Sequence, residues 1–425
     1  MRVILSCEPN GFGPVSKLTA IARLLPDAER IFVGDAGALE FARRNPDCFE
    51  QYLTIAELQQ APDLVAACDF AMVVMEPDVT FELLQAGVPV YLFDSLIEFW
   101  VLPNGVAPLA AAARRILNAS SDDARAIFHA FSIHERKLLA HMIATRSFAQ
   151  NFPGVPQRIE AMAQEGFGDV RLLGSIIDHP PPVGTSRRAQ PDGSWSMLIN
   201  LGGVENFAIR FHDNDYIIDL TEKWAARFLQ DTPDCRAITI CCGRYRQADT
   251  RAVGHGTLTR RFAARDEFMD LLERADVVLS AAGRTTLHEA IHLGKAPILL
   301  PEQHHNQYCN IISLAHTRLG DLSVALSDIV TLGDLPDDDL AGTLRIIEGA
   351  RRVLREPTLF ERFDALLRAR IATFRALDPA HVQAIVDDVA AYLGGADFGA
   401  TVRTLAQQKK PRPSYFQPGA ALIDG

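Results

Sequence analysis

Residues 275–302, ADVVLSAAGRTTLHEAIHLGKAPILLPE, decide the fold of this chain. They read as an apolar strand, a loop with one glycine, a short helix that ends at Gly294 and a second apolar strand. Residues 288–292, HEAIH, also fit the H-E-x-x-H pattern of many zinc proteases. In such a protease both histidines lie on a long helix, and a third ligand comes from elsewhere. We therefore interpret the two histidines as ordinary helix-surface residues and the stretch as part of a nucleotide-binding sheet.

A similar stretch, DFAMVVMEPDVTFELLQAGVPVYLFD, occupies residues 69–94. In both stretches a Glu follows the first Asp by 13 positions and a Gly follows it by 18: Asp69, Glu82 and Gly87, then Asp276, Glu289 and Gly294. Other short apolar runs rich in Val, Ile, Leu and Phe alternate with helical segments through most of the chain. Such alternation predicts parallel sheets that are covered on both faces by helices.

The Pro- and Gly-rich residues 178–194 have no hydrophobic period and separate two strand–helix series. The sequence thus predicts an α/β protein with two doubly wound Rossmann-like domains facing across a cleft, and with C-terminal helices. In the first domain, residues 122–149 are expected to form one longer helical region. The expected boundaries are 1–178 for the N-terminal domain, 179–194 for the linker, 195–375 for the C-terminal domain and 376–425 for helices and a tail.

The composition limits the class of protein. Hydrophobic residues make up 48% of the 425 residues and charged residues 22%, which is ordinary for a soluble enzyme. The formal net charge of -11 argues against a general nucleic-acid binder. Seven cysteines are present without any C-x-x-C pair, which argues against disulfides and structural zinc and fits a reducing cytoplasm. No apolar run approaches the length of a membrane span or of a secretory signal.

The loop that opens the helix in the 275–302 stretch is a candidate anion site. Backbone N–H groups and the helix dipole favour a negative charge at this end of a helix. Gly283 lets a ligand approach the backbone, Thr285 and Thr286 supply hydroxyls, and Arg284 supplies charge. Further into the helix, Glu289 can accept hydrogen bonds from sugar hydroxyls. A diphosphate with a ribose attached suits this arrangement.

These residues carry a resemblance to GT-B glycosyltransferases. The chain resembles the donor-binding segment of the peptidoglycan N-acetylglucosaminyltransferase and of UDP-glycosyltransferases through Asp276, Gly283, Thr286, Glu289, Gly294, Pro297, Pro301, Asn306 and Gln307. The resemblance implies that Glu289 holds the ribose and that residues 283–286 hold the diphosphate. It implies donor-sugar contacts for Glu302, Gln303, Asn306 and Gln307, a first glycine loop at Gly202 and Gly203, and base recognition near Phe262 and Ala263.

The N-terminal loop departs from this family. Gly11 and Gly13 precede the first helix, but Pro14 stands where the family often has a histidine that serves as base. We expect Glu8 to take that role; the alternative is that it caps the next helix or is solvated.

Three further side chains of the N-terminal half are candidates. Lys17 can contact the donor phosphate, although a lysine in the first turn of a helix is often simply exposed. Glu76 and Asp78 can bind the acceptor, or they are helix N-terminal charges favoured by the dipole.

The resemblance implies an enzyme that moves a sugar from a nucleotide sugar, most simply a UDP sugar, to a small soluble acceptor, as in natural-product biosynthesis. A narrower hypothesis is that the acceptor is a nucleobase, as in cytosylglucuronate synthases. We expect no metal and no cofactor, since the nucleotide sugar is a substrate, and neither a nucleic-acid nor a membrane partner; a homo-oligomer stays open. Two alternatives remain: a nucleotide-sugar hydrolase or 2-epimerase on the same fold, and a non-catalytic nucleotide-sugar-binding protein.

Overall fold

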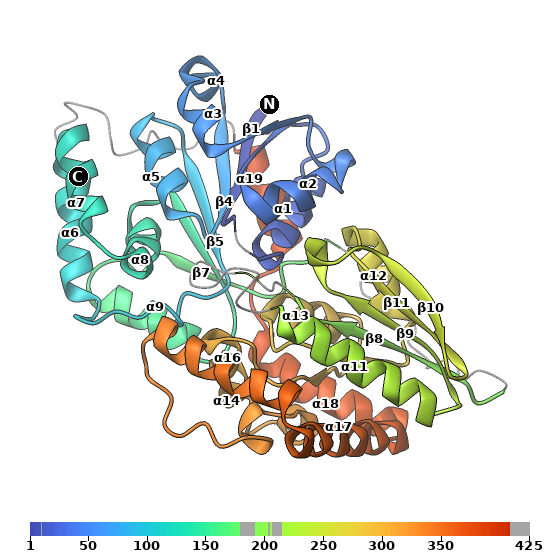
Figure 1. Cartoon of the computed structure of the whole chain (residues 1–425). Coiled ribbons are helices and arrows are strands. Elements are labelled where there is room, and N and C mark those ends of the chain that lie inside the picture. Colours follow the sequence, from blue (N-terminus) through green and yellow to red (C-terminus); the bar gives the residue numbers. More distant parts are fainter. Residues whose placement is uncertain (10, 179–191, 203–204, 206–214, 409–425) are drawn as a thin grey trace. The chain divides into compact units, whose positions relative to one another are not determined.

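The computed structural model describes residues 1–9, 11–178, 192–202, 205 and 215–408. Within these residues the chain forms two compact units (Figure 1). Residues 1–9, 14–178 and 393–408 form the first unit, and the other described residues form the second. Residues 393–408, which the sequence places in an appended C-terminal segment, thus belong to the first unit. Gly203, most of the expected linker and the tail from residue 409 lie outside the described residues.

The first unit is built on a seven-stranded sheet in the order β3-β2-β1-β4-β5-β6-β7. All of its paired strands are parallel. The chain leaves β1 toward β3 on one side and later continues from β4 toward β7 on the other. The carboxyl ends of β1 and β4 therefore form a topological switch point, where doubly wound sheets bind their ligands. The strands are β1 (Arg2–Cys7), β2 (Glu29–Val33), β3 (Gln51–Leu53), β4 (Phe70–Val74), β5 (Val90–Asp94), β6 (Arg146–Gln150) and β7 (Val170–Leu173).

Helices connect these strands, and right-handed crossovers place them on both faces of the sheet. They are α1 (Gly13–Arg23), α2 (Ala36–Arg43), η1 (Pro46–Cys48), α3 (Ile55–Gln59), α4 (Pro62–Ala66), α5 (Pro77–Gln85), α6 (Ala107–Asn118), α7 (Ser121–His129), α8 (Ile133–Ile143) and α9 (Val155–Gln164). A last helix, α19 (Phe398–Gln407), returns to this unit. Gly174 N–H donates to the Ala396 carbonyl at 3.1 Å, and the rings of Phe93 and Phe398 lie 6.4 Å apart, which ties α19 to the sheet.

The second unit has a six-stranded sheet in the order β10-β11-β9-β8-β12-β13. Only the β10–β11 pair is antiparallel among its described pairs. A second switch point lies between β8 and β12, and their carboxyl ends are adjacent to that of β13. The strands are β8 (Trp195–Asn200), β9 (Cys235–Cys241), β10 (Asp249–Val253), β11 (Gly256–Arg261), β12 (Val277–Ser280) and β13 (Ile298–Leu299).

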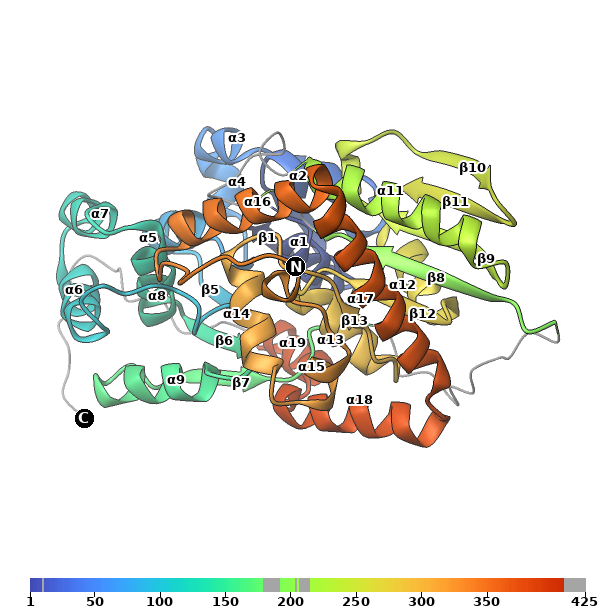
Figure 2. The ribbon, with the colours of Figure 1, turned by 60° about the horizontal axis from the view of Figure 1, so that its bottom comes forward.

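The helices of the second unit are α11 (Tyr216–Asp231), η2 (Gly243–Tyr245), α12 (Arg265–Arg274), α13 (Arg284–His292), α14 (His305–Leu314), α15 (Arg318–Leu322), η3 (Leu326–Asp328), α16 (Asp339–Arg355), α17 (Pro357–Ala376) and α18 (Pro379–Leu393). Figure 2 shows α16 and α17 as two long helices that follow one another. Helix α16 packs against α11, α14 and α17, and α11 in turn packs against β9, β10 and β11 of the sheet.

The apolar runs read from the sequence are confirmed as strands β1, β2, β4, β5, β8, β9, β12 and β13. The helical reading of residues 122–149 is wrong at its end, because residues 146–149 belong to β6. Two of the five β6 residues, Ser147 and Gln150, are buried but polar, which hid the strand from a hydrophobic pattern. All seven cysteines are free thiols, and no described helix is long and apolar enough to cross a membrane.

Candidate active site

In the second unit, hydrogen bonds join the loops that follow β8, β12 and β13. Asn200 Nδ2 donates to Thr286 Oγ1 at 2.6 Å, and Asn200 Oδ1 accepts from Gly202 N–H at 3.2 Å. Gly202 has a φ of 65°, a left-handed conformation that favours glycine. Gln303 Nε2 donates to the Leu201 carbonyl at 3.0 Å. Three adjacent strand ends are thereby held in one polar frame at the edge where doubly wound sheets bind nucleotides.

Helix α14 closes this frame. Arg284 Nε donates to Asn310 Oδ1 at 3.0 Å, and Asn310 Nδ2 donates to the Ala282 carbonyl at 2.8 Å. Gln303 N–H donates to Gln307 Oε1 at 3.0 Å. Of the predicted residues, Arg284 is thus held by Asn310, Thr286 by Asn200, and Gln303 by the Leu201 carbonyl. Gln307 orients the backbone of Gln303.

The amino end of α13 is open. Gly283 is the N-cap residue, with φ -87° and ψ 140°, and it has no side chain with which to cap the helix. A Cβ added at Gly283 would meet no atom of the described residues within 4 Å. Helix α13 starts after Gly283 and ends before Gly294, whose φ is 68°, so the predicted helix boundaries are confirmed. An uncapped helix start beside free space is suited to an anion.

Glu289 is buried and forms an ion pair with Arg265 at 2.9 Å. Their side chains are only 3% and 1% exposed. The surface assignment of His288 is wrong, since this residue is 1% exposed, whereas His292 is half-buried. Across the described residues, no group of three or more His, Cys, Asp or Glu side chains has the arrangement of a metal site.

The loop after β13 holds buried polar atoms without a hydrogen-bond partner among the described residues: Glu302 Oε1, Gln303 Oε1 and Asn306 Nδ2. The other carboxylate oxygen of Glu302 accepts from Leu326 N–H at 2.9 Å. Burial raises the pKa of Glu302, and burial together with His305 lowers the pKa of His304 to about 4. Nδ1 of His304, between them, also lacks a hydrogen-bond partner among the described residues. Because folded proteins satisfy nearly all buried polar atoms, these neighbouring unsatisfied atoms indicate a place for a polar ligand.

The segment expected to recognise the base lies between β11 and α12. Ala263 is buried, and Phe262 is half-buried with its ring 5.0 Å from that of Phe12. Phe12 lies between Gly11, whose φ is 75°, and Gly13, and residues 11–13 belong to the second unit by their contacts. The two glycines of the N-terminal loop are thus grouped with the second unit. Lys17 lies in α1 of the first unit and is buried, not exposed.

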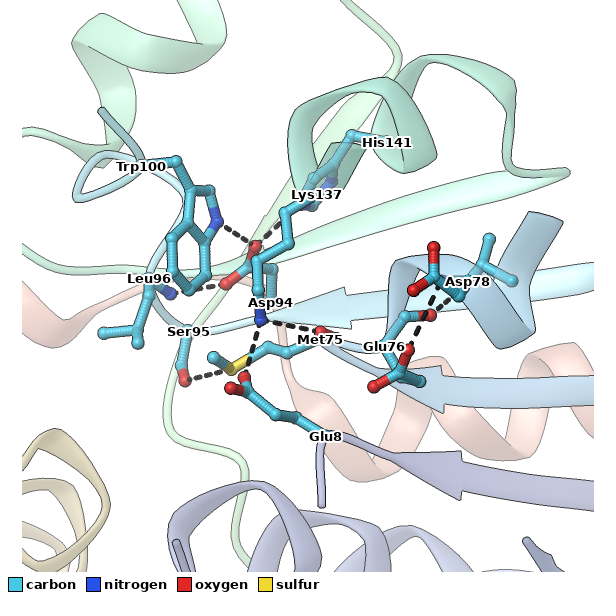
Figure 3. Close-up of polar contacts among 11 residues, drawn as sticks. Glu8, Met75, Glu76, Asp78, Asp94, Ser95, Leu96, Trp100, Lys137 and His141 are labelled. Atoms are coloured by element: carbon cyan, nitrogen blue, oxygen red, sulfur yellow. Dashed lines mark hydrogen bonds and ion pairs between the residues drawn. The ribbon is translucent and has the colours of Figure 1, made fainter. Parts of the chain in front are cut away.

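In the first unit, Glu8 follows β1 at the switch point and is buried (Figure 3). Its Oε2 accepts from Lys137 Nζ at 2.6 Å, and the same ammonium donates to the Met75 carbonyl at 2.9 Å. Lys137 comes from α8 and is 2% exposed. The predicted base is therefore one half of a buried ion pair.

Glu76 follows β4 at the same edge of the sheet and is the N-cap of α5. Its Oε1 accepts from Asp78 N–H at 3.3 Å, as in the helix-cap alternative to acceptor binding. Burial raises the pKa of Glu76 to about 7, against a lowering effect of Lys137 and with a smaller raising effect of Glu8. Asp78 is half-buried and accepts from Arg136 Nη1 at 2.7 Å. The structure thus brings Glu8 and Glu76 around one lysine, while Asp78 belongs to a neighbouring pair.

A second layer supports Lys137. The indole ring of Trp100 lies 4.4 Å from the ammonium, a cation–π distance. Asp94, at the end of β5, accepts from Trp100 Nε1 at 2.7 Å and lies 3.0 Å from His141 Nε2 (Figure 3). Burial alone would raise the pKa of Asp94, but hydrogen bonds from His141, Trp100 and a backbone N–H hold it below its usual value.

Sequence reasoning did not find Lys137, His141 or Trp100. One signal was available in α8, where His134, Lys137 and His141 recur at spacings of three and four residues. Such spacing puts the three on one helix face. All three are buried, so the polar face of α8 points inward and not to solvent. A polar stripe of this kind indicates a functional site only when the neighbouring strand ends are known.

Comparison with known proteins finds similarity to the overall fold and to part of the second unit. Residues 215–328 match the model of the glycosyltransferase family 28 C-terminal domain. The spinosyn rhamnosyltransferase SpnG, solved with thymidine diphosphate, is 15% identical with a TM-score of 0.51, and the match covers 96% of this chain and 100% of that chain. UGT2 of Phytolacca americana, solved with UDP-2fluoro-glucose and pterostilbene, is 12% identical with a TM-score of 0.46 over 92% and 99% of the chains. No curated protein matches the sequence.

The similarity to SpnG shows the fold, which is the GT-B fold with two Rossmann-like domains. The family match covers much of the second unit, including α12, α13 and the loop after β13. The chain therefore has the GT-B fold, and residues 215–328 match a glycosyltransferase domain. Its second unit carries a glycosyltransferase family 28 C-terminal domain.

Proposed function

We propose that this protein is a glycosyltransferase that moves a sugar from a UDP sugar to a soluble small-molecule acceptor in the cytoplasm, without a metal ion, in the biosynthesis of a natural product. The observation that carries the proposal is the set of unsatisfied buried atoms on Glu302, Gln303 and Asn306, next to the uncapped start of α13. A donor that combines a diphosphate with a sugar offers partners to both features.

The diphosphate belongs at the start of α13. The helix dipole and the backbone N–H groups stabilise its charge, and the bare Gly283 leaves room for it. Arg284, fixed by Asn310, adds a cation, so the site has its own means of neutralising phosphate charge. In this proposal Glu289 holds the ribose and Arg265 holds the carboxylate of Glu289.

The reaction forms a bond from the acceptor atom to the anomeric carbon of the sugar. The bond from that carbon to the diphosphate oxygen breaks, and its electron pair leaves with the nucleoside diphosphate. A carboxylate at the switch point of the first unit takes the proton of the acceptor, since Pro14 replaces the usual histidine. The narrower candidate acceptor is a nucleobase, which belongs in any acceptor panel.

A thermal-shift screen with UDP, dTDP and GDP tests the donor. A ligand that binds only the native state stabilises it by about 2.7 kcal/mol at a hundred times its Kd. We expect UDP to raise the Tm of the wild type but not of Gly283→Val, whose side chain enters the open space. The matched control is Gly394→Val, because Gly394 also has no atom within 4 Å of an added Cβ and no left-handed φ. A UDP response that survives Gly283→Val, or no response to any nucleotide, would refute the proposal.

Transfer to water, or epimerisation of the donor, is the second candidate. Two carboxylates around one lysine favour it, because such a group can also activate a water molecule. Incubation with UDP sugars alone separates the two functions. Release of free sugar or of an epimer without any acceptor identifies the second candidate. Tight nucleotide binding without turnover on any acceptor identifies a binding protein instead.

A further inference from the structure

We propose that Glu76, and not Glu8, accepts the proton of the acceptor, and that Lys137 with Glu8 forms the fixed charge pair that positions and tunes Glu76. This assignment rests on the proposed function, because it names the residue that performs one step of the same transfer.

Glu8 is poorly suited to take up a proton. Its carboxylate accepts from the Lys137 ammonium at 2.6 Å, and both side chains are at most 10% exposed. The Lys137 ammonium already occupies Oε2 of Glu8. Protonation of Glu8 would also leave the charge of Lys137 buried without a counter-ion. The pair therefore acts as one fixed unit.

Glu76 has the properties that Glu8 lacks. It is 8% exposed, and Asp78 N–H is its hydrogen-bond donor. Its other carboxylate oxygen has no hydrogen bond to any residue that the structure describes. No cation forms an ion pair with Glu76 in that part of the chain. Because a buried carboxylate without a paired cation is a stronger base, Glu76 is ready to take a proton near neutral pH.

The backbone beside Glu76 is unusual. Met75 has a φ of 61°, which L residues rarely adopt, and this turn places Glu76 at the end of β4. The Met75 carbonyl accepts from Lys137 Nζ at 2.9 Å (Figure 3). Strained backbone of this kind persists where the surroundings hold it, and it concentrates at functional sites. Lys137 therefore fixes both Glu8 and the turn that carries Glu76.

The charged and titratable groups around Glu76 come from α8, from α5 and from the end of β1. They are Lys137 of α8, Glu8 after β1, Asp78 of α5 and the buried thiol of Cys7 in β1. Asp78 is itself paired with Arg136 and lies 4.0 Å from His129. Glu8 and Lys137 act on Glu76 in opposite directions, since the anion opposes its ionisation and the cation favours it.

In the transfer step, Glu76 takes the proton of the acceptor O–H or N–H group. At the same time the acceptor atom bonds to the anomeric carbon, and the diphosphate leaves with the electron pair of the broken bond. The protonated Glu76 then returns its proton to solvent. Because Lys137 neutralises Glu8, the ionised Glu76 carries the unbalanced charge of the three groups, and it disfavours an acceptor whose reacting group is itself negatively charged. The acceptor class is thus a neutral hydroxyl or amine.

The pH dependence of kcat/KM tests the assignment. Glu76→Gln should lower kcat by about 100-fold or more, as expected for loss of a general base. Glu8→Gln should remain active with its acid limb moved to lower pH, and Lys137→Met should move it to higher pH, each by roughly 1 unit. The double variant Glu8→Gln/Lys137→Met removes the pair without a net charge change and guards against misfolding of the single variants. Glu82→Gln, on the same helix, should match the wild type.

Loss of turnover in Glu8→Gln with activity kept in Glu76→Gln would overturn the assignment, as would acid limbs that move in the same direction. Infrared difference spectra of the protein without ligands follow the protonation of Glu76 independently of turnover. The carboxylic-acid band absent in Glu76→Gln should titrate near pH 7 and shift to lower pH in Glu8→Gln. If the band titrates as expected but the protein transfers no sugar, the proposed function is wrong and the properties of Glu76 stand. If the band is absent, the inference about Glu76 is wrong.

Discussion

The two similar stretches of the sequence fold alike and differ in what they hold. Helix α5 joins β4 to β5 in the first unit, and α13 joins β12 to β13 in the second. Even the leading aspartates act alike: Asp69 accepts from Arg2 N–H and Asp276 from Ser196 N–H, both at 2.8 Å, on the neighbouring strands β1 and β8. The helix starts differ, because Glu76 caps α5 with its own carboxylate whereas Gly283 leaves α13 uncapped.

The glutamates at matching positions also differ. Glu82 makes a bidentate pair with Arg125 in which the two side chains are 29% and 46% exposed. Glu289 pairs with Arg265 out of contact with solvent. One backbone plan thus supports a surface ion pair in one unit and a buried pair beside the proposed nucleotide site in the other. The difference lies in the side chains of loops and partner helices, which is where function is added to a fold.

The largest expected effect comes from removing the arginine of each of the two glutamate–arginine ion pairs. Arg265→Met should destabilise the second unit by about 3–5 kcal/mol, because it leaves the Glu289 carboxylate buried without its cation. Arg125→Met should change stability by only about 0–1 kcal/mol, because water screens an exposed pair. Denaturant unfolding of both variants measures the contrast. Equal losses in the two variants would show that the two glutamates are equivalent.

The second effect concerns the carboxylate that caps α5. Burial raises the pKa of Glu76 from 4.5 to about 7, so the native state binds the additional proton between these values. The contribution of this carboxyl group to stability is therefore largest below about pH 4.5 and falls as pH rises, by about 3 kcal/mol once pH exceeds 7. Glu76→Gln keeps the cap acceptor but removes this loss. Urea unfolding of the wild type and of Glu76→Gln at pH 5 and pH 8 measures this loss. We expect the free energy of unfolding to fall more between the two pH values in the wild type. An equal change in both proteins would contradict a buried Glu76 that binds a proton.

The elements with strong patterns could be predicted from the sequence. Continuous apolar runs such as residues 2–7 and 277–280 have one interpretation in a parallel sheet, and Gly283 and Gly294 bound the helix between β12 and β13. The partner of a charged residue could not be predicted. Lys137 lies 129 positions from Glu8, and Arg265 lies 24 from Glu289, so only the three-dimensional fold pairs them. Burial of a charge depends on such a partner, which explains why Glu289 is more buried than its sequence context indicates.

The third effect concerns the start of α13, which a substitution can make similar to the start of α5. Gly283→Asp gives α13 a carboxylate cap of its own, as Glu76 gives α5. Asp is at least as good an N-cap as Gly, so we expect stability without ligand to change by only a few tenths of a kcal/mol. The new charge should repel a diphosphate and abolish the roughly 2.7 kcal/mol of stabilisation by UDP at a hundred times its Kd. Calorimetric titration with UDP checks this. Unchanged affinity would place the diphosphate elsewhere.

The smallest effect concerns the glycine that ends the helix in each of the two similar stretches. Gly87 and Gly294 follow α5 and α13 with φ values of 79° and 68°, a left-handed conformation in which a Cβ is strained. Gly87→Ala and Gly294→Ala should each destabilise by about 1 kcal/mol, since both helices end in the same way. Neither variant should alter UDP binding, because the carboxyl ends of these helices lie away from the strand ends that hold ligands. Equal losses in the free energy of unfolding would support a common backbone plan. A loss confined to one variant would show that the two turns contribute differently to stability.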